Sequence, residues 1–417
     1  MAKKANKGHC VLCGRPEDEV PFLLEGVDGK VCPDCVALAM NMLGENQLLK
    51  ETKAQPFGSP ELDLKALPKP QDIKEHLDHY VVGQDEAKRY LSVAVYNHYK
   101  RLLQHQEPDD EVEIEKSNIL LLGSTGTGKT LLAKTIARLL QVPFTIVDAT
   151  VLTQAGYVGE DIESLLTRLL QVADYDVAAA ERGIVFIDEI DKIARKGDNP
   201  SITRDVSGEG VQQGLLKLLE GSIVNVPPQG GRKHPDQPMI QVNTQHILFI
   251  CAGAFDGIER KIAHRLNTRI VGYNSPGAQH AHLKEEELLR YVDARDLKSY
   301  GLIPEIIGRL PIITHLNPLT RETLRMILTE PRNALTRQYT RMLAMDGIAL
   351  HYTEDALDAI VEKTMEQKLG ARGLRAIMEQ VMMEAMYRLP SEQVTEFTID
   401  RAYVEARLAE SQGVVQA

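Results

Sequence analysis

The sequence predicts an α/β protein whose main domain is built on a parallel sheet. Four short apolar runs alternate with segments of helical spacing, as strands and covering helices do in such a sheet; the runs are 119–122, 144–148, 184–187 and 247–250. A glycine-rich loop pattern follows the first run, and two acidic residues end the third. From residue 317 onward the pattern is mainly helical, with a β-like piece at 396–399. We expect an α/β core followed by a smaller, helical lobe.

The composition is that of an ordinary globular protein. The chain has 417 residues, enough for about two to three domains, and 43% are hydrophobic. With 59 acidic and 48 basic residues the net charge is −11, which disfavours general binding to nucleic acid or to anionic membranes. No apolar run approaches the ~20 residues of a membrane span, and residues 1–8 lack a signal-peptide core. We expect a cytoplasmic protein whose partners are small molecules or proteins.

A phosphate-binding loop is predicted between the strand at 119–122 and a helix at 131–140. The pattern GxxxxGK[ST] is met at every fixed position by Gly123, Ser124, Thr125, Gly126, Thr127, Gly128, Lys129 and Thr130. The glycines let backbone N–H groups close around phosphates, and the helix N-terminus favours negative charge. Lys129 is expected to reach the β- and γ-phosphates of ATP and Thr130 to hold Mg²⁺. The alternative is a chance glycine turn.

The apolar run at 184–187 ends in a second candidate for nucleotide chemistry. Asp188 is expected to help hold Mg²⁺, and Glu189 to orient and polarise the attacking water, since phosphoryl transfer depends on positioning and charge stabilisation. Open α/β sheets bind ligands at the carboxyl ends of their strands, where both carboxylates would lie. The alternative is a parallel strand that ends in a solvated acidic turn.

Four of the five cysteines have the spacing of a zinc site. Cys10, Cys13, Cys32 and Cys35 form C-x2-C-x18-C-x2-C, so their thiolates could share one tetrahedral Zn²⁺ in a closed, structural site. Two disulfides or unligated thiols are the alternatives. Cys251 lies in an apolar segment and is interpreted as a core residue.

The chain is expected to contain three domains. Residues 1–50 have few apolar side chains and would need the metal to fold. A linker with prolines at 56, 60, 68 and 70 spans 51–70. The large ATPase domain then covers 71–316, and the small helical domain covers 317–417.

Nearly the whole chain resembles the ClpX family of AAA+ protein unfoldases. The resemblance is carried by HLDHYVVGQDEAKR at 76–89, GSTGTGKT at 123–130, GYVGED at 156–161, FIDEIDK at 186–192, SITRDVSGEGVQQ at 201–213, GRKHP at 231–235, GLIPEIIGRLP at 301–311 and GARGLR at 370–375. It implies an AAA+ P-loop ATPase core with a parallel sheet, a mainly helical C-terminal small domain and a small N-terminal zinc-binding domain with four cysteine ligands. It also implies a ring, most simply a homohexamer.

The resemblance gives further roles at the nucleotide. Val81 and Val82 would line the adenine pocket, Arg372 would be the sensor-2 arginine, and Arg309 would be the arginine finger that reaches a neighbouring subunit's nucleotide. A guanidinium beside the γ-phosphate stabilises transition-state charge, and one supplied by a neighbour links hydrolysis to assembly. Without the family pattern, Arg309 would be interpreted as an arginine in a surface ion pair.

Three segments resemble the loops that grip a polypeptide in the pore of the ring. Tyr157 and Val158 lie in the first, and Arg204 lies in the second. The third contains Arg232, Lys233 and His234, whose positive charge could attract a substrate carboxylate. An aromatic ring between glycines suits gripping, since apolar contact is not directional. On residue type alone, these segments would be an ordinary turn and solvated loops.

A fourth segment resembles the loop by which the family docks on a ClpP-type peptidase. Its tripeptide is Val271-Gly272-Tyr273, where the family has Ile or Leu, Gly and Phe, so it keeps the aliphatic-Gly-aromatic order but adds a hydroxyl. Neither HExxH nor GxSxG occurs, so we expect no intrinsic peptidase activity. One oddity is Gly214 in the apparent helix 211–219, where glycine costs up to ~1 kcal/mol.

These features together predict an ATP-dependent unfoldase and translocase, a chaperone of protein quality control. It would thread protein substrates into a ClpP-type peptidase, with adaptors binding through the zinc domain. One alternative is a protease-independent remodeller of protein complexes. Another is a nucleic-acid motor with a zinc finger, which the acidic balance disfavours.

Overall fold

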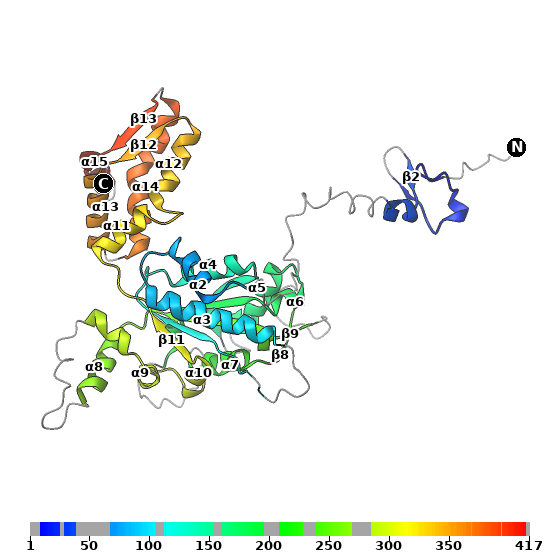
Figure 1. The fold of residues 1–417 in the computed structure, drawn as a ribbon, viewed down its shortest axis with the longest axis horizontal. Helices are drawn as coiled ribbons and strands as arrows, with labels where there is room; N and C mark the ends of the chain where they lie inside the picture. Colours follow the sequence, from blue (N-terminus) through cyan, green and yellow to red (C-terminus); the bar gives the residue numbers. More distant parts are fainter. Residues whose placement is uncertain are drawn as a thin grey trace. The chain divides into compact units, whose positions relative to one another are not determined.

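The computed structural model describes residues 9–25, 29–38, 67–104, 112, 114–153, 160–195, 208–227, 239–268, 285–367, 369–392 and 394–413. The chain divides into two compact units, Met1–Gly58 and Ser59–Ala417, drawn in Figure 1. The division falls inside the predicted linker. Within the described ranges, no helix is long and apolar enough to cross a membrane.

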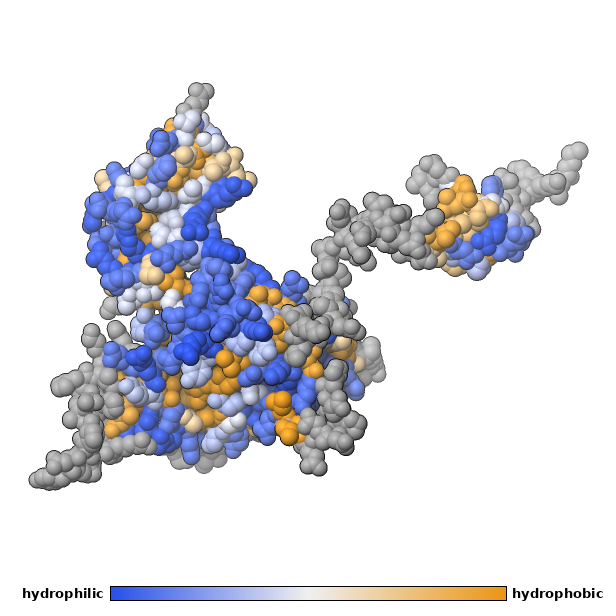
Figure 2. All heavy atoms as spheres, viewed as in Figure 1, coloured by the Kyte–Doolittle hydropathy of each residue, from blue (hydrophilic) through white to orange (hydrophobic). Residues whose placement is uncertain are grey.

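The N-terminal unit has little regular structure and a very small core. A 3₁₀ turn, η1 (Glu17–Glu19), precedes β1 (Leu24–Glu25), which pairs antiparallel with β2 (Lys30–Val31), and residues 33–38 are helical. Its buried cluster consists of Cys10, Val20 and Cys32. Figure 2 shows hydrophobic side chains on the surface of this unit; those exposed are Val11, Leu12, Phe22, Leu24 and Leu38. Such a unit needs cross-links to fold.

The large lobe of the second unit is built on a five-stranded sheet in which every pairing is parallel. The strand order is β11-β3-β10-β7-β4. Their bounds are β3 (Ile119–Leu122), β4 (Phe144–Asp148), β7 (Ile184–Asp188), β10 (Leu248–Gly253) and β11 (Ile312–His315). The parallel sheet predicted from the sequence is therefore confirmed. The last predicted run, 247–250, corresponds to β10, which begins one residue later and extends to Gly253. β11 was not predicted.

Helices cover both faces of this sheet. Successive side chains of a strand point to opposite faces, so each strand contributes to two separate cores. Ile119 and Leu121 of β3 pack in one core, whereas Leu120 and Leu122 pack in the other. The first core lies under α2 (Pro70–Asp78), α3 (Asp85–Leu102) and α4 (Lys129–Leu140). The second includes side chains of α5 (Ser164–Val172), α6 (Val177–Ala180), α7 (Glu209–Glu220), α8 (Ile258–Thr268), α9 (Ala294–Tyr300) and α10 (Pro304–Arg309). Burial on both faces explains the unbroken apolar runs.

Several short elements connect these helices and strands. Two small pairs lie outside the main sheet: β5 (Leu152–Thr153) with β6 (Glu160–Asp161), and β8 (Ile223–Val226) with β9 (Ile240–Asn243). Where the structure describes this lobe, its 3₁₀ turns are η2 (Ala149–Val151), η3 (Ile190–Ile193), η4 (Thr244–His246) and η6 (Glu285–Tyr291); a further turn, η7 (Leu389–Ser391), belongs to the small lobe.

The small lobe has its own core. Helices surround a parallel pair of strands, β12 (Ala349–Tyr352) and β13 (Glu396–Ile399). These helices are α11 (Arg321–Thr329), α12 (Leu335–Met345), α13 (Glu354–Gln367), α14 (Ala371–Arg388) and α15 (Arg401–Gly413). Its buried cluster runs from Leu324 to Leu408 and is separate from the two cores of the sheet. β13 coincides with the predicted β-like piece, whereas its partner β12 was not predicted.

Gly214 has a packing role in α7. A Cβ added there would overlap Cδ1 of Ile162, which belongs to the second core of the sheet. Carbon atoms pack at about 3.5–4.0 Å, so a larger side chain would displace Ile162 or the helix. This contact accounts for a glycine that helix propensity alone disfavours.

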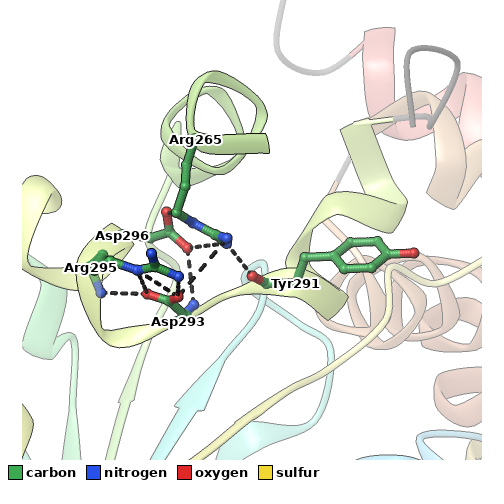
Figure 3. A network of polar contacts seen from close by, with 5 residues as sticks. All are labelled: Arg265, Tyr291, Asp293, Arg295 and Asp296. Carbon is green, nitrogen blue, oxygen red and sulfur yellow. Dashed lines mark hydrogen bonds and ion pairs between the residues drawn. The ribbon is translucent and has the colours of Figure 1, made fainter. Parts of the chain in front are cut away.

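An ion-pair network joins α8 to α9, as Figure 3 shows. Arg265 donates from Nε and Nη2 to the two carboxylate oxygens of Asp296, each at 2.8 Å, and Asp296 is only 2% exposed. Asp293 caps the N-terminus of α9 and lies 3.9 Å from Arg265 Nη1. The network therefore fixes the two helices on either side of residues 269–284.

Candidate functional site

The predicted phosphate-binding loop lies between β3 and α4. Lys129 begins α4 and is 8% exposed. Its Nζ donates to the carbonyl oxygens of Ser124, at 3.0 Å, and Gly123. Thr127 Oγ1 also donates to the Ser124 carbonyl, at 2.8 Å. Burial lowers the pKa of Lys129, and the charge of Asp188 opposes this shift. A bound phosphate anion would stabilise the positive charge of this buried ammonium group. The loop therefore fits the anion that its sequence predicts.

The two predicted Mg²⁺ ligands face each other at the end of the sheet. Thr130 Oγ1 lies 3.4 Å from Asp188 Oδ2. Two ligands of one Mg²⁺, each at about 2.1 Å, can be at most ~4.2 Å apart, so this pair can share one cation. β10 separates β3 from β7 in the sheet, but all three strands are parallel and end at the same edge.

Glu189 has a strained backbone beside these ligands. Its φ is +57°, in the left-handed region, and its N–H donates to Asp188 Oδ1 at 3.0 Å. Such a conformation costs of order 1–3 kcal/mol in a residue other than glycine and is found mainly at functional sites. The turn places the Glu189 side chain on the cavity described next.

A cavity of about 350 Å³ surrounds the loop and is lined by both lobes. From the predicted site it contains Thr125, Gly126, Gly128, Lys129, Thr130, Asp188, Glu189 and Arg372. No role was predicted for Asp191, Lys192, Ala254, Asp256 and Arg375, which also line it, although the first two lie in FIDEIDK and Arg375 lies in GARGLR. Asp191 and Lys192 follow Glu189 directly, and Asp256 follows the carboxyl end of β10, where α/β sheets bind ligands. The rule that α/β sheets bind ligands at the carboxyl ends of their strands could have identified Asp256 from the sequence.

The backbone of the small lobe contacts the phosphate-binding loop directly. Ala371 N–H donates to the Gly126 carbonyl at 3.3 Å. A Cβ on Gly126, whose φ is +85°, would lie 2.8 Å from the Leu369 carbonyl oxygen. A Cβ on Gly370, with φ +59°, would lie 3.0 Å from the Thr125 carbonyl oxygen. Only glycine permits this close approach at both positions. It puts Arg372, two residues later, on the cavity.

Val81 and Val82, the predicted adenine contacts, follow α2. Val81 is buried, and its Cγ1 lies 3.9 Å from the position of a Cβ on Gly128. Val82 is half-buried. Lys88 fixes the backbone of Val81. Its Nζ donates to the Val81 carbonyl oxygen at 2.5 Å and to Asp78 Oδ1 at 2.7 Å. An apolar side chain therefore borders the loop, on the side of α2.

Arg309, the predicted arginine finger, is not among the described residues that line this cavity. It is the last residue of α10, and its side chain is 50% exposed. Nη2 and Nε contact Glu220 Oε1 at 3.0 and 3.2 Å. The side chain of Arg309 is therefore exposed in an ion pair, and the described part of the cavity is lined without it.

The four N-terminal cysteines form a cluster of the size of a zinc site. Their Sγ atoms all lie within 4.8 Å of one another, and Cys13 Sγ is 3.6 Å from Cys32 Sγ. Tetrahedral Zn–S bonds of ~2.3 Å require sulfur atoms about 3.8 Å apart. The Cys32 N–H donates to Cys10 Sγ at 3.3 Å and is the main cause that lowers the pKa of Cys10 to about 6, whereas a hydrogen bond with Cys13 and burial raise the pKa of Cys35 to about 12. All five cysteines are free, and Cys251 is buried in the sheet, as expected.

The predicted substrate and partner loops lie outside the described residues. They are Tyr157 and Val158 in 154–159, Arg204 in 196–207, Arg232, Lys233 and His234 in 228–238, and Val271, Gly272 and Tyr273 in 269–284.

The phosphate loop, the acidic strand end and a second, helical lobe together define a P-loop ATPase of the AAA class, which uses ATP and Mg²⁺. The model of the family described as "AAA domain (Cdc48 subfamily)" matches residues 114–313. The "C-terminal, D2-small domain, of ClpB protein" matches 319–404, and the "ClpX C4-type zinc finger" matches 8–45. The zinc-finger match and the cysteine cluster together identify Zn²⁺ as a second metal cofactor, bound in the N-terminal unit.

Relatives similar over nearly their whole length identify the family. Proteins of Porphyromonas gingivalis (65% identical, covering 98% of each chain) and Bacteroides thetaiotaomicron (63%, covering 98% of this chain and 97% of the relative) are named "ATP-dependent Clp protease ATP-binding subunit ClpX". The Bacteroides fragilis protein of that name is 63% identical, covering 97% of this chain and 96% of the relative. The chain belongs to the ClpX family. The predicted family, fold class and cofactors are confirmed.

Proposed function

We propose that this chain is the ATPase subunit of a Clp-type protease, which unfolds protein substrates and threads them into a separate ClpP-type peptidase. The names of its relatives describe ATP-binding subunits of such a protease. The observation that carries the proposal is the cavity shared by the phosphate loop and the small lobe. A ligand bound to both lobes can shift their relative position, and that is the mechanical step an unfoldase needs.

The nucleotide roles follow from the geometry of the cavity. Lys129 and the loop N–H groups would hold the phosphates, while Thr130 and Asp188 would hold Mg²⁺, which neutralises charge on the β- and γ-oxygens. Glu189 would accept a proton from, and orient, the attacking water. Arg372 would contact the γ-phosphate from the small lobe, and Val81 with Val82 would hold the adenine.

Further hydrogen bonds connect the two lobes outside the cavity itself. Gln84, at the start of α3, exchanges two side-chain hydrogen bonds with the backbone of Asn317, at 2.8 and 2.7 Å. Arg332 N–H donates to the His79 carbonyl at 2.9 Å. We place the domain boundary at 316–317, with the large domain at 71–316 and the small domain at 317–417. Asn317 would be the hinge about which ATP moves them.

Rings of six subunits would form the translocating pore. Arg309 would complete the nucleotide site of the next subunit, which explains why it lies on the surface in an ion pair with Glu220. Tyr157, Val158, Arg204, Arg232, Lys233 and His234 would line the pore and grip the substrate. The Val271-Gly272-Tyr273 segment would dock on the peptidase, between helices that the Arg265–Asp296 ion pair fixes.

The predicted zinc-binding domain, 1–50, would recruit substrates and adaptors. Zn²⁺ held by Cys10, Cys13, Cys32 and Cys35 supplies the cross-link that its small core lacks. Five exposed apolar side chains, Val11 to Leu38, make a surface suited to protein partners rather than to nucleic acid.

An ATP-dependent unfolding assay tests the proposal. A fluorescent protein carrying an unstructured tag should lose its fluorescence only with the ATPase and ATP, and should be cut into peptides only when ClpP is added. Tyr157→Ala should still hydrolyse ATP but unfold less substrate per ATP. Unfolding without any ClpP binding, by the wild type and by Tyr273→Phe, would instead indicate a protease-independent remodeller. ATPase activity stimulated by DNA but not by unfolded protein would contradict both.

A further inference from the structure

We propose that Asn118 is the positioning residue of the arginine finger. It lies directly before β3, the strand whose other end carries the phosphate-binding loop. Its amide nitrogen donates to the carbonyl oxygen of Arg309 at 2.9 Å and to that of Leu219 at 3.1 Å. Arg309 ends α10, and Leu219 is in the last turn of α7. One buried side chain therefore joins the sheet to the ends of both helices.

The need for an amide at this point follows from the two helix ends. The last four carbonyl groups of a helix lack intrahelical partners. Both groups that Asn118 contacts are such carbonyls, and Asn118 is only 1% exposed, so water cannot replace it. Because both partners are acceptors, the nitrogen must be the atom that faces them. Aspartate offers no donor there, and leucine, of similar size, offers no polar contact.

The side chain of Arg309 is held by a second contact from the same region. Glu220, the last residue of α7, accepts hydrogen bonds from its guanidinium at 3.0 and 3.2 Å. Asn118 thus fixes the Arg309 backbone relative to α7, while Glu220, on α7, orients the guanidinium. The exposed ion pair is weak and can be exchanged for a neighbour's phosphate, whereas the buried amide contact persists.

Lys116 provides an internal comparison two residues earlier. Its Nζ donates to the carbonyls of Leu218, at 3.2 Å, and Thr244, at 2.8 Å. It caps the same end of α7 as Asn118 but makes no hydrogen bond with Arg309 among the described contacts. A general loss of support for α7 would therefore follow from changing either residue, whereas misplacement of the finger should follow only from changing Asn118.

The inference rests on the proposed role of Arg309, and the experiment separates the two. ATP hydrolysis and binding of a fluorescent ATP analogue are measured for the full-length wild type, Arg309→Ala, Asn118→Leu and Lys116→Met. We expect Asn118→Leu to lower kcat at least tenfold, roughly as Arg309→Ala does, with KM and analogue affinity within about twofold of the wild type. Lys116→Met should keep kcat within about twofold. An unchanged kcat in Arg309→Ala refutes the finger itself; a low kcat there with normal Asn118→Leu activity refutes only the inference.

Mixed rings distinguish a misplaced finger from a damaged fold. Asn118→Leu subunits retain their own pocket but present a displaced finger, whereas Glu189→Gln subunits cannot hydrolyse ATP but present an intact one. Mixing the two should raise the turnover per Asn118→Leu subunit at least threefold, and Arg309→Ala subunits should respond equally. If Asn118→Leu subunits remain inactive in rings where Arg309→Ala subunits are rescued, Asn118 acts on the fold and the inference is wrong.

Discussion

Substitution of Gly214 tests the packing of α7 most directly, because two known effects oppose each other there. Alanine in a helix interior is favoured over glycine by ~1 kcal/mol. The added Cβ of Gly214→Ala would, however, overlap Ile162 Cδ1, and overpacking a well-filled core costs ~1–3 kcal/mol. We expect the second effect to exceed the first by about 1 kcal/mol, which lowers the Tm of the large lobe by ~2–4 °C.

A second substitution removes the atom that causes the clash. Ile162→Val deletes Cδ1 and alone costs ~0.5–1.5 kcal/mol. The next atom, Cγ1, is 3.5 Å from the new Cβ, an ordinary contact distance. The double variant should therefore recover the helix preference and unfold close to the wild-type temperature, a favourable coupling of ~2 kcal/mol between the two positions.

Differential scanning calorimetry of the four proteins measures this coupling. Gly308→Ala is the matched control: Gly308 lies in α10 with no described atom within 4 Å of an added Cβ, so alanine should not lower the Tm. A Gly214→Ala protein that melts above the wild type, or additive effects in the double variant, would refute the steric explanation.

Three further predictions concern the two metal-linked sites and a buried histidine. Glu189→Gln should bind ATP normally but lose at least ~10²-fold in kcat, since the amide cannot accept the proton from water; hydrolysis at the wild-type rate would remove Glu189 from its role. Freshly purified protein should contain one zinc per chain by elemental analysis, and Cys13→Ser should lose it while keeping the ATPase; a metal-free wild type contradicts the site. Burial and the nearby positive charge of Arg101 lower the pKa of His98 from 6.5 to about 3. Between these pH values, His98 is protonated in the unfolded chain but neutral in the folded chain. The free energy of unfolding should therefore fall as the pH falls from 6.5 toward 3, and His98→Gln should flatten this dependence in acid denaturation; an unchanged slope would show that His98 is not the group responsible.

The sequence by itself determined the chemistry of the nucleotide and zinc sites. Glycines that must approach phosphate, a lysine and a threonine at the helix start and two acids after an apolar strand are local requirements, so Gly123–Thr130, Asp188 and Glu189 could be found from spacing alone. The same is true of the four cysteines, because a tetrahedral metal fixes their separation. Strands β3, β7 and β10 were recognisable as well, since burial on both faces leaves an unbroken apolar run.

Only the tertiary structure decided which distant residues complete those sites. Neither β11 nor β12 is an unbroken buried run, so no local pattern marks them. Gly126 and Gly370 meet only because two lobes fold against each other. Asn118 is an ordinary polar residue in the sequence, and its contact with Arg309 spans 191 positions. Local spacing specifies a ligand site because the ligand is small; contacts between helix ends depend on how whole elements pack, which no short window of sequence contains.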